Sequence, residues 1–231
     1  MLKIESHSEC LEQETASLNL LSSVKIHYRR IFHDLPYELR QILKGCESVL
    51  DLGCGPSSPI RSLPRDFHSV GIDIYEKSVE ESKRKCIHNE YFVMDTLDIE
   101  QKFQPNSFDC VLAIDLIEHL EKKDGVRLIQ LMEKIAKKKV VIFTPNGFLF
   151  QQERDGNLWQ IHRSGWTVQE MRKMGYRVIG MSGIKFLRGE RASLKFSPRR
   201  VWVVISDLTQ LFVRNRPDKA FQILCIKEFA K

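Results

Sequence analysis

Residues 49–58 read VLDLGCGPSS, and this stretch decides the fold because an apolar run leads directly into a turn with two glycines. The apolar run is typical of a buried strand in a parallel sheet. Gly53 and Gly55 lack a Cβ, so the backbone at the turn can approach a ligand closely. The stretch therefore predicts a strand and turn that bind a nucleotide-like cofactor.

Asp51 lies inside this strand, two residues before Gly53. A dinucleotide-binding site needs no charged residue at this position, whereas a carboxylate suits a cationic group of the ligand. Ser58 stands where the dinucleotide fingerprint places a third small residue, usually Gly or Ala, for close packing of helix on strand. The match to that fingerprint is therefore imperfect, and Asp51 favours a positively charged ligand.

Two further acids close the next two predicted strands. Asp73 ends the apolar run 69–74, and Asp95 ends the run 91–95. Asp73 follows Gly55 at the spacing of a carboxylate that accepts hydrogen bonds from ribose hydroxyls, which fits NAD and S-adenosylmethionine equally. Asp95 alone is also explained as the cap of a turn. Carboxyl ends of parallel strands share one edge of a sheet, so we expect the three acids to gather there.

The pattern D-x-G-x-G after an apolar strand resembles the first motif of the class I S-adenosylmethionine-dependent methyltransferases. A further strand, 107–114, contains F-D-x-V and leads into the segment Asp115–Leu120 with Glu-His-Leu, which resembles small-molecule methyltransferases of the ubiquinone-biosynthesis type. The H-x-x-x-W pattern from His162 to Trp166 is common in the same relatives. The resemblance covers about residues 45–185 and the last strand.

This resemblance implies an α/β fold with a doubly wound, mostly parallel sheet of seven strands, a Rossmann-like methyltransferase fold. It implies S-adenosylmethionine as the cofactor, with Asp95 receiving the amino group of adenine. The residues that the resemblance assigns to the cofactor are Asp51, Gly53, Gly55, Asp73, Ile74, Asp95, Thr96 and Ala113.

Three residues after the fourth strand are candidates for catalysis. His119 is the best general base by residue type, since an unperturbed imidazole titrates near neutral pH, although it could equally point into the fold. Asp115 could bind the methionine amino group or the acceptor. Glu118 could orient His119 or simply begin a helix. Adjacent Glu118 and His119 do not make a metal site, so no metal is expected, and His162 is interpreted as an anchor of its loop.

The acceptor is expected to be a small molecule methylated at oxygen. Enzymes that methylate exocyclic amines of DNA bases have an N/D-P-P-Y/F motif after strand four, where residues 114–117 read IDLI, and no Pro-Cys dipeptide suggests methylation of cytosine carbon. An NAD-dependent dehydrogenase leaves Asp51 and Asp95 unexplained. A catalytically inactive S-adenosylmethionine-binding adaptor or regulatory subunit remains an alternative, because intact cofactor residues do not prove turnover.

The composition is that of an ordinary soluble protein. The 231 residues are 42% hydrophobic and 29% charged, and no run approaches the roughly 20 apolar residues of a membrane span, so a cytoplasmic location is expected. The six cysteines include no C-x-x-C pair and are interpreted as free thiols. A net charge of +6 is spread over the chain and is interpreted as a solvated surface, with nucleic acid an unlikely partner.

One domain, 1–231, is expected, with two additions. Residues 1–47 predict helices that cover either the cofactor cleft or the sheet edge. Residues 187–217 look like an insertion on the substrate side, before the closing strand at 220–226. Within it, 199–216 has an apolar helical stripe flanked by arginines. That helix is interpreted first as a lid over the acceptor, with a dimer contact or a peripheral contact with an anionic membrane as alternatives. The oligomeric state is left open.

Overall fold

The computed structural model describes residues 31–153, 156–189 and 193–229. The strands are β1 (Ser48–Leu52), β2 (His68–Asp73), β3 (Glu90–Val93), β4 (Phe108–Ile114), β5 (Ala136–Pro145), β6 (Arg177–Ile184) and β7 (Ala220–Glu228). The α-helices are α3 (Leu35–Ile42), α4 (Glu76–Arg84), α5 (Lys122–Ile135), α6 (Val168–Lys173) and α7 (Arg199–Val213). Short 3-10 helices lie between them.

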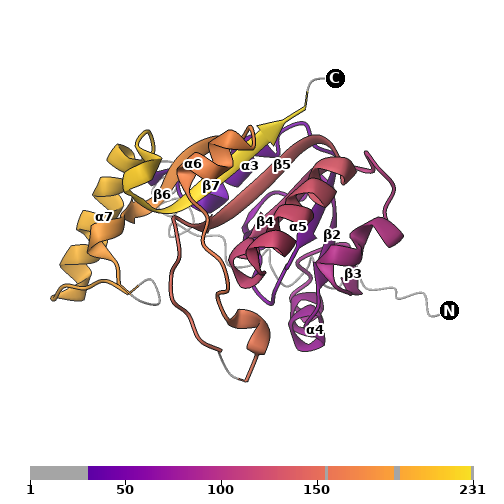
Figure 1. Cartoon of the computed structure of the whole chain (residues 1–231), viewed down its shortest axis with the longest axis horizontal. Coiled ribbons are helices and arrows are strands. Elements are labelled where there is room, and N and C mark those ends of the chain that lie inside the picture. The colour runs from indigo at the N-terminus through magenta and orange to yellow at the C-terminus, as the bar shows by residue number, and fades with distance from the viewer. Residues whose placement is uncertain (1–30, 154–155, 190–192, 230–231) are drawn as a thin grey trace, which may run out of the picture.

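All seven strands form one sheet in the order β3-β2-β1-β4-β5-β7-β6 (Figure 1). Strands β1 to β5 are mutually parallel, and β7 runs antiparallel to both of its neighbours, β5 and β6. The chain order reverses beside β1, between β2 and β4, and ligands of open α/β sheets bind at such a point. The predicted fold, a doubly wound and mostly parallel sheet of seven strands, is confirmed.

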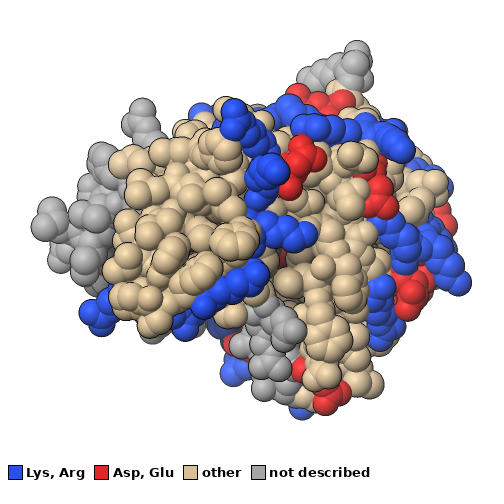
Figure 2. All heavy atoms as spheres, turned by 60° about the vertical axis from the view of Figure 1, so that its left-hand side comes forward, with Lys and Arg blue, Asp and Glu red and all other residues tan. Residues whose placement is uncertain are grey.

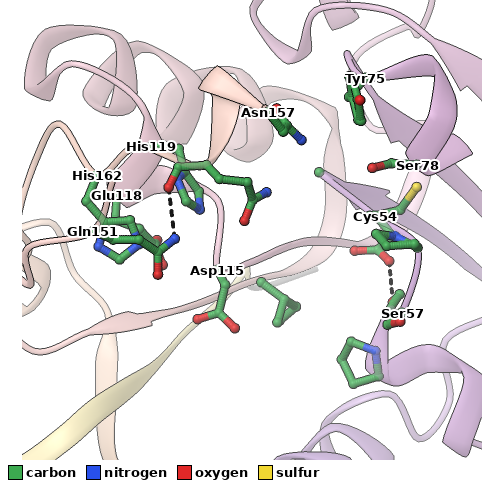
Figure 3. Close-up of a pocket in the computed structure, with 18 of the residues that line it drawn as sticks. Cys54, Ser57, Tyr75, Ser78, Asp115, Glu118, His119, Gln151, Asn157 and His162 are labelled. Carbon is green, nitrogen blue, oxygen red and sulfur yellow. Dashed lines mark hydrogen bonds between the residues drawn. The ribbon is translucent and has the colours of Figure 1, made fainter. Parts of the chain in front are cut away.

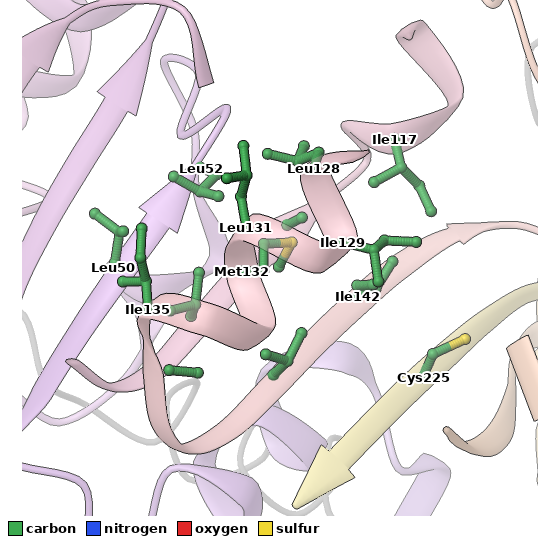
Figure 4. Packing of buried hydrophobic residues seen from close by; sticks show 14 of the residues in the cluster. Leu50, Leu52, Ile117, Leu128, Ile129, Leu131, Met132, Ile135, Ile142 and Cys225 are labelled. Carbon is green, nitrogen blue, oxygen red and sulfur yellow. The ribbon is translucent and has the colours of Figure 1, made fainter. Parts of the chain in front are cut away.

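Helix α5 covers one face of the sheet. Figure 4 shows its apolar side chains packed over strand residues such as Leu50 and Leu52 of β1 and Ile142 of β5. The fully or almost fully buried residues of the helix that form this layer are Leu128, Ile129, Met132 and Ile135. Their spacing of three and four residues gives an apolar stripe, which explains why this segment is a surface helix.

Helix α3 packs on the opposite face, where Leu39 and Ile42 meet Val49 of β1. Asp34 caps its first turn by accepting a hydrogen bond from the backbone N–H of Tyr37 at 3.0 Å. This helix is the described part of the predicted cover, 1–47, and the rest of that prediction, residues 1–30, lies outside the described residues.

Two connections between elements are short. The first crossover contains only the 3-10 helix η2 (Pro59–Ser62), whose first turn is capped by Ser58. Helix α5 ends at Ile135, and β5 begins at the next residue without a connecting loop. The chain turns there because Ala136 adopts an extended conformation while its N–H still bonds to the carbonyl of Met132.

The cysteine expectation is correct in part. Cys46, Cys54, Cys110 and Cys225 are free and buried. Cys86 is instead disulfide-bonded, which corrects the interpretation of that residue as a free thiol. Cys10 lies outside the described residues.

Among the helices of the described ranges, none has both the length and the apolar character needed to cross a membrane.

Candidate functional site

A cleft of about 730 Å³ opens at the carboxyl edge of the sheet, where β1 and β4 end. Figure 3 shows residues from two sides of it. One side, which we call the glycine-turn wall, consists of Asp51, residues 53–59 and the start of α4 with Tyr75 and Ser78. The other, the histidine wall, consists of Asp115, Glu118, His119, Gln151, Asn157 and His162. A ligand in the cleft would contact both walls.

The glycine turn has the backbone conformation that its sequence predicts. Gly53 and Gly55 adopt φ angles of +65° and +51°, in the left-handed region that favours glycine. A Cβ on Gly53 would lie 2.7 Å from Cδ1 of Leu116, so a side chain there would collide with the segment after β4. The turn therefore brings bare backbone to the cleft, as cofactor binding requires.

Asp73 holds the turn in place from the end of β2. Its carboxylate accepts hydrogen bonds from the backbone N–H groups of Gly55 and Tyr75, each at 2.9 Å. Burial raises the pKa of Asp73 above its usual range, and these hydrogen bonds oppose the rise. The carboxylate thus lies at the carboxyl end of β2, and its oxygens have lone pairs left to accept hydrogen bonds from a ligand hydroxyl.

Asp51 lines the cleft although only 1% of it is exposed. Burial raises its pKa to about 7, while a hydrogen bond donated by the Ser58 hydroxyl at 2.6 Å opposes the rise. Nε2 of His88 lies 3.4 Å from the same carboxylate, yet neither ring nitrogen of His88 has a hydrogen-bond partner. Burial lowers the pKa of His88 to about 4, so the neutral ring does not neutralise Asp51. A cationic group of a bound ligand would neutralise the Asp51 carboxylate instead.

The other predicted cofactor residues are placed less directly. Asp95 accepts a hydrogen bond from the N–H of Leu97 at 2.9 Å and caps the 3-10 helix η3 (Thr96–Gln101), which is the alternative role considered for it from the sequence. Ala113 is fully buried in the core. Only Asp51, Gly53 and Gly55 of the eight residues line the cleft itself, and the five that do not are Asp73, Ile74, Asp95, Thr96 and Ala113.

On the histidine wall, Asp115 directly follows β4 with an unusual backbone. Its φ of +48° is left-handed, which is rare outside glycine and clusters at functional sites. The side chain faces the open cleft and accepts a hydrogen bond from Nε2 of Gln222 at 3.1 Å. Protein packed around it raises the pKa of Asp115 to about 7 by desolvation, although the cleft leaves the carboxyl in contact with water. An acid that titrates near neutrality in a cleft is a candidate for proton transfer.

Glu118 is 2% exposed and lies on the 3-10 helix η4 (Ile117–His119). Its carboxylate accepts a hydrogen bond from the Thr144 hydroxyl at 2.9 Å, and burial and then the charge of Asp115 raise its pKa well above the usual range. Its backbone carbonyl accepts hydrogen bonds from the N–H groups of Arg163 and Ser164. Glu118 therefore ties the end of β5 and the following loop to this wall.

His119 and His162 meet edge to face, with ring centroids 4.8 Å apart. Nδ1 of His119 donates to the carbonyl of Ile161 at 3.2 Å, and Nδ1 of His162 donates to the carbonyl of Leu149 at 2.6 Å. Because a carbonyl can only accept, each Nε2 keeps its lone pair. Burial, and then the neighbouring His162, lowers the pKa of His119 to about 4, and burial also lowers that of His162. Both rings are neutral at pH 7.

One ligand atom from each of Glu118, His119 and His162 lies within 4.8 Å of the others, so these three side chains could hold a metal ion. The carbonyl bonds to the two Nδ1 atoms are the outer contacts that orient metal-binding histidines in proteins. The sequence analysis missed this cluster because His162 comes 43 positions after His119, and nothing in the sequence shows that the loop returns to η4.

The loop returns because residues 164–166 dock it on η4. Trp166 is fully buried, and its Nε1 donates to the carbonyl of Ile117 at 3.2 Å and to the Ser164 hydroxyl at 3.1 Å. Lys122 lies over the indole, 3.7 Å from the ring centroid. In the H-x-x-x-W pattern, Trp166 is therefore a buried structural residue, whereas His162 lines the cleft.

The insertion does not contribute to the cleft. Among the described residues that line the cavity, none lies between 187 and 217. Helix α7 instead packs against β6 at the edge of the sheet. Its interpretation as a lid over an acceptor therefore has no contact to support it in this structure.

Comparison with known proteins agrees with the fold. Residues 49–139 match the family described as "Methyltransferase domain". A small RNA 2'-O-methyltransferase from Tetrahymena thermophila is 24% identical over 173 residues, which cover 60% of this chain and only 41% of that protein. The chain thus spans about two fifths of the length of that relative.

Two solved structures are similar at low sequence identity. A SAM-dependent methyltransferase from Archaeoglobus fulgidus has a TM-score of 0.53 at 16% identity, covering 89% of this chain and 99% of that one. The methyltransferase domain of a bacterial Hen1 protein has a TM-score of 0.56 at 16% identity, with the same two coverages, 89% and 99%. These likenesses concern the fold alone.

The methyltransferase match begins at the glycine-turn strand and extends through α5 into β5, the part of the chain that carries the strand-end acids. Taken with the order of the sheet, this match and the similar structures show that the chain resembles the S-adenosylmethionine-dependent methyltransferases in its fold.

Proposed function

We propose that this methyltransferase acts on a hydroxyl oxygen of a small acceptor that lies against the histidine wall. The observation that carries the proposal is the cluster of Glu118, His119 and His162 facing the glycine-turn wall across the same cleft. Among the described residues that line the cavity, Lys77 is the only Lys or Arg, whereas four are acids. An acidic cleft suits a neutral hydroxylated molecule better than a polyanion.

The cofactor would lie along the glycine-turn wall. Asp73, whose carboxylate already holds the turn through Gly55, would accept hydrogen bonds from ribose hydroxyls, and Asp51 would receive a positively charged group of S-adenosylmethionine. Asp95 would have to exchange its bond to the N–H of Leu97 for the amino group of adenine, or use its second oxygen. This arrangement would direct the methyl group toward the histidine wall.

Methyl transfer needs in-line approach and loss of the hydroxyl proton. The acceptor oxygen forms a bond to the methyl carbon as the carbon–sulfur bond breaks, and the bonding electrons remain on sulfur. His119 has a free Nε2 lone pair that could take the proton, but a pKa of about 4 makes it a weak base at pH 7. Asp115, with a pKa of about 7, is better matched to this task.

A divalent cation on the three-residue cluster would remove the need for a strong base. Two imidazoles and one carboxylate suit ions such as Mn²⁺ or Zn²⁺. Such an ion lowers the pKa of a bound hydroxyl. Glu118, His119 and His162 would hold it, while Asp115 would accept the proton. This differs from the expectation of no metal, which rested on adjacent Glu118 and His119 and on the lack of an acid at residues 145–147 after the fifth strand.

Release of S-adenosylhomocysteine in the presence of phenols, sugars and nucleosides tests the proposal. We expect turnover with at least one hydroxylated class, loss of it in EDTA, and recovery with Mn²⁺. His119→Ala should lower kcat by about 10² to 10⁴. Binding of S-adenosylmethionine without turnover on any acceptor would favour the inactive adaptor. Turnover that is insensitive to EDTA would contradict the metal ion and leave removal of the hydroxyl proton to Asp115 or His119.

A second candidate acceptor is the 2'-hydroxyl of an RNA end. It is favoured by the similarity to a small RNA 2'-O-methyltransferase and by exposed aromatic side chains near the cleft, Phe148, Phe150 and Trp159, on which bases could stack. An RNA that ends in an ordinary ribose, compared with the same RNA ending in a 2'-deoxyribose, separates the candidates. Methylation of the first RNA alone, with no small acceptor active, would replace the small-molecule proposal.

A further inference from the structure

Helix α7 turns its apolar residues away from the protein. A surface helix normally buries its apolar stripe, but the buried residues of α7 include Ser206 and Gln210. Its outward residues are each between 42% and 57% exposed, and they are Val201, Val203, Val204, Leu208, Leu211 and Phe212. The arrangement is the reverse of that in α5.

The reversal is built into the contact with β6. Nε2 of Gln210 donates to the carbonyl of Gly180 at 3.0 Å, and Oε1 of Gln210 accepts from the N–H of Gly183 at 3.1 Å. A Cβ on Gly183 would lie 2.5 Å from the carbonyl oxygen of Ser206, so the glycine permits this close approach. Rotating the helix to bury its apolar side would leave those buried polar groups unpaired. The apolar side therefore stays outward.

Basic side chains border this outward side. Lys195, Arg199 and Arg200 are exposed at the start of α7, and Arg216 is exposed after its end. Asp207 is half-buried and acts electrostatically on Arg188. Figure 2 shows this side as a broad uncharged area with Lys and Arg at its margin, and no acidic side chain of the described residues is seen within it. The surface thus combines an apolar centre with a positive border.

Aromatic rings extend the apolar centre beyond the helix. Phe186 is 70% exposed, and its ring centroid lies 6.0 Å from that of Phe196, which in turn lies 4.6 Å from that of Trp202. Aromatic side chains of this kind gather at the boundary between lipid headgroups and acyl chains. We call the outward residues of α7 together with these three rings the α7 face.

We propose that the α7 face docks on an anionic lipid surface. At 15 residues α7 is shorter than the roughly 20 residues needed to span a bilayer, so it would lie in the plane of the interface with its apolar side in the headgroup region. A second copy of the chain is a poorer occupant. Symmetric pairing of the same face would bring the two basic borders together.

Vesicle flotation with the full chain tests the proposal. We expect binding to phosphatidylcholine vesicles that contain about a third phosphatidylglycerol, none to pure phosphatidylcholine, and weaker binding at high salt. Val204→Asn with Leu208→Asn should weaken binding at least tenfold, because both side chains are exposed and their loss spares the fold. Arg199→Gln with Arg200→Gln should weaken it roughly fivefold per arginine.

Two controls match these variants elsewhere on the surface. Val93, 51% exposed at the opposite edge of the sheet, is the counterpart of Val204, and Val93→Asn should leave binding unchanged. The exposed pair Arg172 and Lys173 on α6 matches Arg199 and Arg200. Absence of flotation with anionic vesicles, or equal losses in the controls, overturns the proposal. A dimer in sedimentation that the double Asn variant dissociates would assign the face to a second copy instead.

Discussion

The two walls of the cleft are built in different ways. The glycine-turn wall contains Asp51 of β1 and is held in place by Asp73, which ends the neighbouring strand β2, so the register of the sheet brings the two acids together. On the histidine wall, His119 comes from a 3-10 helix and His162 from a loop that a buried Trp docks beside it. The first wall follows from a linear pattern of strand ends, whereas the second exists only once the loop has folded. Variants that affect one wall and spare the other test this division.

The largest expected effect is on turnover through the histidine wall. Glu118→Gln keeps an oxygen for the Thr144 hydroxyl but replaces the other carboxylate oxygen of the cluster with an amide nitrogen, which does not bind a metal ion. We expect kcat to fall by about 10² to 10⁴ while the Kd for S-adenosylmethionine stays unchanged. Initial rates and calorimetry measure the two quantities. Glu121→Gln, at an exposed position three residues on, is the matched control. A kcat within threefold of wild type would remove Glu118 from the site.

A smaller effect is expected on the glycine-turn wall. Asp73→Ala removes the acceptor of charge-assisted hydrogen bonds from the cofactor ribose and releases the N–H of Gly55. The Kd for S-adenosylmethionine should rise about tenfold to a hundredfold. Asp98→Ala, an exposed acid on η3, should leave the Kd unchanged. Equal Kd values for wild type and Asp73→Ala would sink this assignment of the cofactor residues.

The pH dependence of cofactor binding separates the walls further. Asp51 has a pKa of about 7 when buried without a ligand, and a cationic ligand favours its ionised form. Affinity for S-adenosylmethionine should therefore rise about tenfold between pH 6 and pH 8, with a proton released near pH 7. Calorimetry in two buffers of different ionisation enthalpy measures the proton. Asp51→Asn should abolish the pH dependence of the affinity. A pH dependence that persists in this variant would contradict the assignment to Asp51.

The same residue gives a stability prediction of fixed sign. The folded-state pKa of Asp51 lies above the value near 3.9 of an unfolded chain, so its contribution to stability is present below that value and lost as pH rises through 7. The free energy of unfolding of the ligand-free protein should fall between pH 5 and pH 8. Denaturant titrations should show a smaller fall in Asp51→Asn, where Asp115 and Glu118 still contribute. An equal fall in both proteins would contradict the prediction.

The smallest effect concerns one cap on each wall. Ser58 caps η2 and bonds to Asp51, and Asn157 caps the 3-10 helix η5 (Leu158–Gln160) by accepting from the N–H of Trp159 at 3.0 Å. Each cap stabilises its wall by about 1 kcal/mol. Ser58→Ala should raise the Kd of the cofactor about fivefold, and Asn157→Ala should raise only the KM of the acceptor. Each variant is the control for the other. A change in the acceptor KM with Ser58→Ala, or in the cofactor Kd with Asn157→Ala, would contradict the assignment of cofactor and acceptor to separate walls.

The sequence predicts the fold well where one residue pattern has one structural solution. The near-continuous apolar runs of β1 and β4 can be satisfied only inside a parallel sheet, and glycine at 53 is required by the approach of Leu116. The strand-end acids were predicted for the same reason. The cofactor role of Ala113 stays a prediction, because a small residue near a strand end can face the cleft or the core, and here it is buried in the core.

Prediction fails where two faces of an element compete. The apolar stripe of α7 is visible in the sequence, but which side meets the protein depends on contacts of Gln210 in α7 with Gly180 and Gly183 in β6. The approach of His162 to His119 likewise depends on Trp166, whose indole binds the carbonyl of Ile117. Such contacts join distant positions and have no periodicity that a sequence pattern could reveal.

The position of β7 has a consequence for how the protein is made. Strand β7 pairs with β5 on one side and β6 on the other, yet it follows both in the chain and is synthesised only after residues 185–219. Until then the growing sheet has an open edge along β5, and β6 has no partner strand among the described residues. Open edges recruit other chains. The nascent polypeptide is therefore expected to be most prone to aggregation, and most dependent on chaperones, in the interval before this strand emerges from the ribosome.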